Sequence, residues 1–199
     1  MAARLTVALM FAAGVVYPAL LWSVSKAAFP RQAEGSLVYG PGGRVVGSEL
    51  IGQAFTRPEY FHSRPSVVAY DAATSSGSNI GPTNPQLLAG NGTAYAGVES
   101  YAATYRRENG LATDAAVPND AATASGSGLD PHISPANAEL QVARVAAARA
   151  PALSIGVVRA LVRANTAGRT AGILGEPRVN VLRLNIALDS ASAAARGKP

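Results

Sequence analysis

The sequence predicts an α+β protein: a single N-terminal transmembrane helix followed by one mixed α/β soluble domain with a small sheet. Three observations predict this class. A run of 21 residues near the N-terminus carries no charge, two short strand-like segments flank a glycine-rich turn, and two later segments begin with a helix-capping residue followed by proline. The chain has 199 residues, of which 48% are hydrophobic and 15% charged, which leaves room for one ordinary domain and an anchor.

The composition excludes several classes of function. Cysteine is absent, so disulfide frameworks, cysteine zinc sites and thiol nucleophiles are excluded, and with only His62 and His132 we expect no metal site. Lysine occurs only at Lys26 and Lys198, so no lysine is placed for a P-loop and an autonomous Walker-type nucleotidase is excluded. The net charge of +5 comes from scattered arginines, so we expect no nucleic-acid partner.

The uncharged run Leu5–Ser25 is long enough to cross a membrane. A helix of this length reaches about 31 Å, close to the thickness of the hydrocarbon core of a bilayer. The alternative is a cleaved signal peptide, whose apolar core is shorter, at about 7–15 residues. Basic residues flank both ends, with Arg4 before the run and Lys26 after it, so charge does not set the orientation. Because the run is longer than a signal-peptide core, we favour a retained anchor.

Two regions show strand patterns. Ser36–Tyr39 and Arg44–Ile51 flank the turn Gly40–Gly43, which predicts a β-hairpin. Near the C-terminus, Val179–Leu188 alternates large aliphatic residues on one face and predicts a further strand. The small and polar residues after it predict a flexible end. The expected domains are the anchor at 1–26, the mixed α/β domain at 27–188 and a flexible tail at 189–199.

Helix signals dominate the rest of the chain. A helix is predicted over about 84–110, although glycines at positions 90, 92 and 97 weaken its first half, and residues 111–123 are predicted to be a linker. Further helices are predicted over about 134–149 and 154–165, each opened by a serine cap. In the first of these two helices, the expected apolar stripe is Leu140, Ala143 and Ala147, and the expected polar stripe is Asn137, Gln141 and Arg144.

A short motif occurs twice. Ser76–Pro82 and Ser125–Pro131 both read S-G-S-x-[Ile/Leu]-x-Pro, and each precedes a predicted helix start. The functional interpretation is a pair of neighbouring rigid loops that form one surface. The alternative is chance repetition in a sequence rich in glycine and serine. The two interpretations differ in where the loops lie in the fold.

The second copy of the motif contains residue types that also occur in enzymes. Ser125, Ser127, Asp130 and His132 suggest a Ser-His-Asp arrangement, but no G-x-S-x-G nucleophile elbow accompanies them. A secreted hydrolase is therefore the least favoured alternative, and we expect no catalytic residue. Phosphate binding at residues 125–134 is harder to dismiss, because glycines and a helix N-terminus favour anions, although the loop has no lysine.

Four blocks of the sequence together resemble one protein family. The blocks are Gly47–Phe55 with Tyr60-Phe61 and Arg64–Ser66; Ser76–Pro85; Thr123–Pro135 with Gln141, Arg144–Ala146 and Ala148-Arg149; and Leu174–Leu182 with Leu184-Asn185. The family is the C subunit of the Kdp-type potassium-transporting P-type ATPase, KdpC. The chain departs from the family pattern at Gly90–Gly92 and at the Ala/Thr-rich stretch 111–116, so the middle helix is expected to be shorter.

This resemblance implies a function and a set of partners. The chain would be an accessory, non-catalytic subunit of a high-affinity ATP-driven potassium uptake complex, anchored once in the bacterial inner membrane with its domain on the extracytoplasmic side. Its partners would be the potassium-channel-like subunit KdpA, the P-type ATPase subunit KdpB, the small membrane subunit KdpF and the membrane. It would stabilise assembly and act as a catalytic chaperone that raises the ATP affinity of the ATPase subunit. No cofactor is expected to bind tightly, and ATP would be reached through that partner.

The resemblance also implies candidate site residues. A nucleotide contact would involve Ser125, Gly126, Ser127, Gly128, Asp130 and Gln141. Partner contacts or structural roles would fall to Ser78, Asn79, Gly81, Pro82, Asn84, Pro85, His132, Glu176, Pro177, Arg178 and Asn180. From the residues themselves, Glu176 and Arg178 are expected to form an ion pair.

The expected topology conflicts with a direct nucleotide contact. A domain outside the cell cannot touch ATP on the inner face of the membrane. Any effect on nucleotide affinity would then travel through the membrane helices as a coupling free energy. A membrane-tethered regulator that binds nucleotide itself is the alternative.

Overall fold

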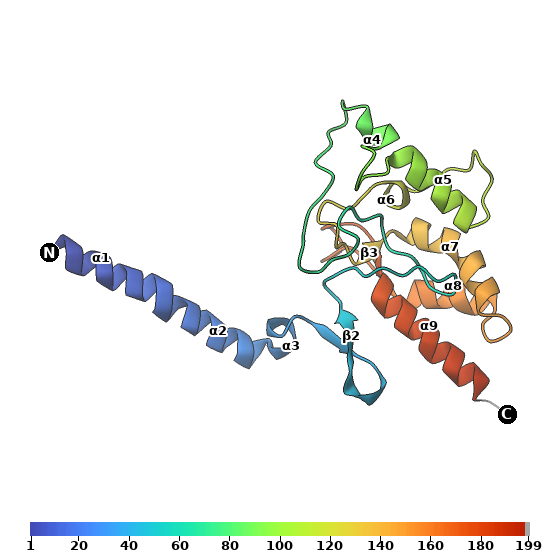
Figure 1. Ribbon diagram of the computed structural model, residues 1–199. Coiled ribbons are helices and arrows are strands. Elements are labelled where there is room, and N and C mark those ends of the chain that lie inside the picture. Colours follow the sequence, from blue (N-terminus) through green and yellow to red (C-terminus); the bar gives the residue numbers. More distant parts are fainter. Residues whose placement is uncertain (198–199) are drawn as a thin grey trace. The chain divides into compact units, whose positions relative to one another are not determined.

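A computed structural model of the chain describes residues 1–197 (Figure 1). The chain divides into two compact units, Met1–Ser48 and the part that begins at Glu49. The first unit contains α1 (Ala2–Phe11), a π-helical turn η1 (Ala12–Val16), α2 (Tyr17–Ala28), α3 (Pro30–Ala33), β1 (Leu37–Tyr39), the short turn η2 (Pro41–Gly43) and β2 (Val45–Ser48). The second contains α4 (Gln86–Ala89), α5 (Val98–Glu108), α6 (Asn119–Ala122), β3 (His132–Ile133), α7 (Pro135–Ala148), α8 (Ile155–Ala164), β4 (Thr166–Ala167), β5 (Arg178–Asn180) and α9 (Val181–Arg196).

The expected apolar helix is present in the first unit. α1, η1 and α2 form one helix, Ala2–Ala28, of 27 residues, which is long and apolar enough to cross a membrane. The π-helical turn contains Gly14 and lies just before Pro18. Proline lacks an N–H and its ring collides with the carbonyl four residues earlier, so a local widening of the helix accommodates it.

The predicted β-hairpin is also present in the first unit. β1 and β2 pair antiparallel, with Leu37 opposite Ser48 and Tyr39 opposite Val45, and the register shifts by a bulge after Val38. The glycine-rich turn connects the two strands. Gly42 and Gly43 both adopt positive φ angles, of 75° and 72°, which glycine tolerates without strain.

The second unit has a hydrophobic core between helices and a small sheet. The sheet is antiparallel in the order β3-β5-β4, and α8 packs on both α7 and α9. The core consists of Phe61, Ile133, Ala138, Val142, Val145, Ala146, Leu153, Val158, Val162, Val179, Val181, Leu184 and Leu188. The predicted serine caps are confirmed: Ser134 accepts a hydrogen bond from the Asn137 N–H and Ser154 accepts one from the Val157 N–H.

The predicted stripes of α7 are wrong. Asn137 and Gln141, expected on the polar face, are each only 1% exposed. Ala143 and Ala147, expected inside, are exposed. The aliphatic positions that face the core are Ala138, Val142 and Val145, so the helix is rotated relative to the prediction. Hydrogen-bonding partners from other segments let the polar side chains be buried, and a pattern based on hydrophobicity cannot anticipate this.

The predicted strand Val179–Leu188 is also wrong beyond its first residues. β5 ends at Asn180, whose side chain accepts from the Arg183 N–H and caps α9. Val181, Asn185, Leu188 and Ser192 are all buried, and this spacing of three and four residues fits a helix face. The alternating leucines suggested a strand, but Leu182, Leu184 and Leu188 are instead buried residues of α9.

The residues expected to form a flexible tail instead continue α9. The helix runs through Arg196, and Ser192 within it is 4% exposed. Asp189 pairs with the buried Arg149 at 2.8 Å. These two contacts attach the last turns to the core. Residues 198–199 of the expected tail lie outside the described residues.

The predicted middle helix is divided in two. α4 and α5 are separated by a loop in which Gly90 and Gly97 both have φ of 87°. A Cβ at Gly97 would lie 2.4 Å from the Leu88 carbonyl oxygen, so the loop closes tightly on itself. Tyr95, 2% exposed, fills the loop and donates from its hydroxyl to the Leu87 carbonyl. The short helix α6 lies within the predicted linker 111–123.

Candidate functional site

The two copies of the S-G-S motif lie side by side in the second unit. The Ser76 N–H donates to the Ser127 carbonyl at 3.0 Å, and the Ser75 hydroxyl donates to the same oxygen at 3.2 Å. Gly77 and Gly126 are so close that a Cβ at Gly77 would lie 2.7 Å from the Gly126 carbonyl oxygen. The loops therefore lie next to each other, as the functional interpretation of the repeat requires.

In the candidate nucleotide loop, residues 125–130, several backbone groups are hydrogen bonded within the protein. The Ser125 N–H donates to the Pro65 carbonyl, and the Leu129 N–H to the Ser127 hydroxyl. Gly128 has φ of 71°, its N–H donates to the Ser125 carbonyl and its carbonyl accepts from the Ser66 hydroxyl. Three amides that could cradle a phosphate are thus already hydrogen bonded.

Asp130 closes this loop through two partners. One carboxylate oxygen accepts from the His132 N–H at 2.9 Å, and the other accepts from the Arg64 guanidinium at 3.0 Å. Burial alone raises the pKa of Asp130, but the hydrogen bonds from His132 and Arg64 together outweigh it and hold the pKa below its usual value. The Ser127 hydroxyl accepts from a backbone amide, and within residues 1–197 it is not hydrogen bonded to His132, so no Ser-His-Asp relay is assembled.

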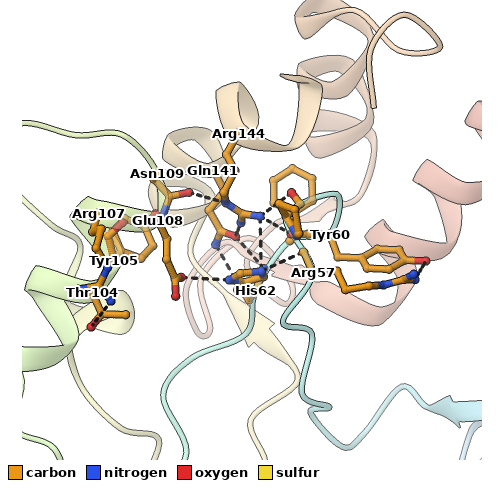
Figure 2. A network of polar contacts seen from close by, with 12 residues as sticks. Arg57, Tyr60, His62, Thr104, Tyr105, Arg107, Glu108, Asn109, Gln141 and Arg144 are labelled. Carbon is orange, nitrogen blue, oxygen red and sulfur yellow. Dashed lines mark hydrogen bonds and ion pairs between the residues drawn. The ribbon is translucent and has the colours of Figure 1, made fainter. Parts of the chain in front are cut away.

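Gln141 lies at the centre of a separate polar network on α7 (Figure 2). Its Oε1 accepts from the His62 N–H and from Arg144 Nη2, each at 2.7 Å. Its Nε2 donates to Asn137 Oδ1 at 2.8 Å and to the His62 carbonyl at 3.2 Å. Both hydrogens and both lone pairs of this amide are therefore used inside the protein. A nucleotide contact would require Gln141 to give up one of these bonds.

Arg144 joins three segments through the same network (Figure 2). Its Nη1 donates to the carbonyls of Pro58 and Tyr60 at 2.7 and 2.9 Å, and its Nε donates to Asn109 Oδ1 at 3.0 Å. These bonds connect α7 to the segment before His62 and to the end of α5. The arginine thus fixes a stretch of chain that has no secondary structure of its own.

The His62 ring lies between opposite charges. Its Nδ1 is 3.3 Å from Glu108 Oε2, and its Nε2 is 3.4 Å from Arg144 Nη1 and 3.1 Å from the Arg57 carbonyl oxygen. Burial lowers the pKa of His62, and the positive charge of Arg144 lowers it further, whereas Glu108 acts in the opposite direction. Arg144 lies in one of the sequence blocks, but its contacts with His62 and Glu108 were not predicted, because these residues are far apart in sequence and His62 and Glu108 belong to no motif.

A cleft of about 210 Å³ lies beside Gln141. His62, Arg64, Tyr101 and Glu108 are among the residues that line it, whereas residues 125–130 are not. The structure therefore does not bring Gln141 and the candidate loop into one cavity. The cleft is also smaller than the roughly 300–1,000 Å³ of typical small-molecule pockets.

The candidate partner residues fall into two surface groups. In the first, Asn79, Gly81, Pro82, Asn84 and Pro85 are exposed and Ser78 is half-buried. Asn84 Oδ1 accepts from the Gln86 N–H at the start of α4, so this segment is ordered although it is exposed.

The second group lies around β5. The expected ion pair between Glu176 and Arg178 is wrong, because both carboxylate oxygens of Glu176 accept from Arg169 Nη2, at 2.8 and 3.0 Å. Pro177 is exposed. Arg178, Asn180 and His132 line a cavity of about 440 Å³.

Comparison with known proteins identifies the family. Residues 1–190 match the family model KdpC, described as the c chain of the K+-transporting ATPase. The chain belongs to the KdpC family. A potassium-transporting ATPase KdpC subunit of Methylococcus capsulatus is 54% identical over 180 residues, which cover 89% of each protein. Subunits of the same name are 50% identical in Gemmatimonas aurantiaca, covering 95% of this chain and 90% of the relative, and in Mycobacterium tuberculosis, covering 93% and 95%. The resemblance noted in the sequence blocks is confirmed.

Proposed function

We propose that this chain is the accessory, non-catalytic C subunit of a high-affinity, ATP-driven potassium uptake complex in the bacterial inner membrane. The observation that carries this proposal is the KdpC family match over residues 1–190, which includes the apolar helix as well as the domain. Relatives named potassium-transporting ATPase KdpC subunit cover the chain almost end to end. Its partners would be the channel-like subunit KdpA, the ATPase subunit KdpB and the small subunit KdpF.

The proposed role is to stabilise assembly. The helix Ala2–Ala28 would span the membrane once, and the second unit would lie on the extracytoplasmic side. Two features support an assembly role. Within the residues that the structure describes, no residue of this helix is buried, so its apolar surface is available to lipid or to other membrane helices. The mostly exposed segment 79–85, in which Asn84 hydrogen bonds to the start of α4, offers a surface on the second unit.

We further propose that any effect on the ATP affinity of the ATPase subunit is indirect. Gln141 is saturated with internal hydrogen bonds, three amides of the loop 125–130 are occupied, and the cleft beside Gln141 is small. A catalytic chaperone of this kind would act by a coupling free energy transmitted through the membrane helices. A regulator that binds nucleotide directly remains the alternative hypothesis.

Removal of the anchor tests the assembly role. We expect a chain that lacks residues 2–28 to be found outside the membrane fraction and to be lost from the complex when the ATPase subunit is purified through an affinity tag. The matched control replaces residues 2–28 with an unrelated single-pass helix of the same length and orientation. If the control co-purifies with the complex, a membrane tether of any sequence is sufficient for assembly. Full co-purification of the chain without any anchor would contradict the proposed role of the helix.

Equilibrium titration separates the indirect effect from direct nucleotide binding. The purified full chain in detergent is titrated with Mg-ATP, and we expect no saturable binding up to millimolar concentration. The ATP affinity of the ATPase subunit, measured in the complex with and without this chain, should still differ. Saturable binding to the isolated chain that is lost in Gln141→Ala and retained in the surface control Glu139→Ala would favour the nucleotide-binding regulator.

A further inference from the structure

The segment between β4 and β5 presents an apolar tip to solvent. Ile173 and Leu174 are 76% and 62% exposed. The tip is ordered: the Thr170 N–H donates to the Leu174 carbonyl at 2.8 Å and the Leu174 N–H donates back at 2.9 Å. The ion pair between Arg169 and Glu176 closes the hairpin below the tip. The two aliphatic side chains are therefore held in solvent by a defined turn, at a cost in free energy that burial against a partner would recover.

A cavity of about 440 Å³ lies at the base of the same hairpin. Arg178 is one of the charged residues that line it. Arg183 in the same cavity is neutralised by Glu49. Arg169, higher on the hairpin, is neutralised by Glu176. Within residues 1–197, no acidic side chain pairs with Arg178, although this residue lies in the central strand of the sheet and is half-buried. The cavity thus has one uncompensated positive charge.

Other polar groups of the cavity are occupied by their own chain. Asn180 Nδ2 donates to the Glu49 carbonyl, Asn165 Nδ2 donates to the Leu161 carbonyl, and the Thr166 hydroxyl donates to the Val162 carbonyl. The guanidinium of Arg178 is left as the strongest donor. Its planar fork matches a carboxylate, which it can bind through two parallel hydrogen bonds.

We propose that the hairpin 166–180 is a docking surface for an acidic loop of another subunit of the complex. An apolar side chain of that loop would cover Ile173 and Leu174, and an aspartate or glutamate elsewhere on the same loop would enter the cavity and pair with Arg178. This proposal rests on the proposed function, because it requires the chain to assemble with other subunits.

A protein loop fits this surface better than a lipid surface. An apolar tip and a polar cavity on one hairpin resemble the apolar core and polar rim of protein interfaces. One uncompensated arginine adds only about 1 kcal/mol of attraction to an anionic membrane. Arg183 and Arg169 add little further attraction, because each is already paired with a glutamate of this chain.

Photo-crosslinking in the intact complex tests the tip. The full chain carries p-benzoylphenylalanine in place of Ile173, and the complex is purified from membranes through a tag on the ATPase subunit. We expect irradiation to join this chain to another subunit, at a peptide that contains aspartate or glutamate. The matched control carries the same probe in place of Ile155, an aliphatic residue that is 48% exposed at the start of α8. The control should give no crosslink to a subunit.

Charge reversal tests the cavity. We expect Arg178→Glu to lower the crosslink yield from position 173 about tenfold, and Arg178→Lys to retain most of it. Arg107→Glu, an exposed change on α5, should leave the yield unaltered. The thermal unfolding midpoint of Arg178→Glu should match that of the parent chain, because Arg178 has no ion pair within residues 1–197 to lose; a large shift in the midpoint would contradict the description of the cavity.

Each remaining outcome is informative. Crosslinks to lipid alone, no crosslink at position 173, or a yield that is unaffected by Arg178→Glu would overturn the docking surface. If the unmodified chain fails to co-purify with the ATPase subunit, the proposed function itself fails. If it co-purifies but its hairpin contacts no subunit, only the docking surface is refuted.

Discussion

At the scale of single residues, α7 buries amide and guanidinium groups where hydrophobic periodicity expects surface. Gln141 and Arg144 are one turn apart, and both direct their side chains toward the segment 57–62. That segment lacks regular hydrogen bonds, so its backbone groups need partners from elsewhere. The two side chains provide them, which explains why polar residues lie on the inner face of this helix.

Removal of the Gln141 amide should destabilise the protein. In Gln141→Ala the His62 N–H and the Asn137 carboxamide lose partners in a buried site, and we expect the free energy of unfolding to fall by about 2–3 kcal/mol. Urea denaturation of the full chain in detergent measures this. Glu139→Ala on the same helix removes only an exposed ion pair with Arg159 and should cost less than about 1 kcal/mol. Equal effects of the two changes would contradict the buried network.

His62 should make the stability depend on pH. Burial, followed by the charge of Arg144, lowers the pKa of His62 in the folded state, so the neutral ring is favoured there. In the unfolded chain a histidine takes up a proton near pH 6.5, so the unfolded state binds more protons as the pH falls. Stability that is present above about pH 6.5 is therefore lost below it. Denaturation midpoints between pH 7.5 and 5.5 should fall less steeply in His62→Gln; an unchanged slope would show that His62 is not responsible.

At the scale of elements, the two S-G-S loops show why a repeated motif carries structural information. Each loop is too short to fix its own position. The Ser76 N–H and the Ser75 hydroxyl of the first loop both donate to the Ser127 carbonyl of the second, and the Gly52 N–H donates to the Leu129 carbonyl. Glycine is required where the backbones meet, because a side chain there would collide with a carbonyl group.

The contact between the loops predicts unequal effects of two similar changes. In Gly77→Ala the new methyl group would meet the Gly126 carbonyl, and we expect a loss of about 1–3 kcal/mol in the free energy of unfolding. Gly126→Ala is the matched control, since a Cβ there has no atom within 4 Å. Chemical denaturation of both variants measures the difference. If both changes prove neutral, the loops do not pack as described.

Arg149 should anchor the last turns of α9. It is 6% exposed, and its guanidinium donates to the Glu59 carbonyl, the Ser192 hydroxyl and Asp189. We expect Arg149→Ala to cost about 2–3 kcal/mol and to speed amide hydrogen exchange in residues 189–196. Arg159→Ala, which breaks an exposed pair, serves as the control. Rapid exchange of residues 189–196 in the unaltered chain would show instead that this end is loose from the start.

At the scale of the whole molecule, the hydrophobic core found within residues 1–197 lies in the second unit, and its members all come after residue 60. We therefore expect a chain that lacks residues 1–48 to fold by itself and to unfold in one cooperative transition. Gel filtration and thermal circular dichroism would test this. Aggregation, or a transition without cooperativity, would mean that the first unit contributes to the stability of the second.

The sequence by itself determined the features that depend on neighbouring residues. The apolar helix follows from a run without charges, the β1–β2 hairpin from a turn of glycines and proline, and the starts of α7 and α8 from their serine caps. The family blocks were also visible in the sequence, because motifs of this length are specific. Each of these features depends on residues close together in the chain.

Only the tertiary structure decided the features that need distant partners. It turned Val181–Arg196 from an expected strand and tail into α9, because the core accepts a stripe spaced by three and four residues and Arg149 binds the far end. It buried Gln141, because the segment 57–62 needed hydrogen-bond partners. It also left Arg178 without a carboxylate within residues 1–197, because Glu176 pairs with Arg169. Burial and charge pairing are set by three-dimensional neighbours, which local sequence patterns do not specify.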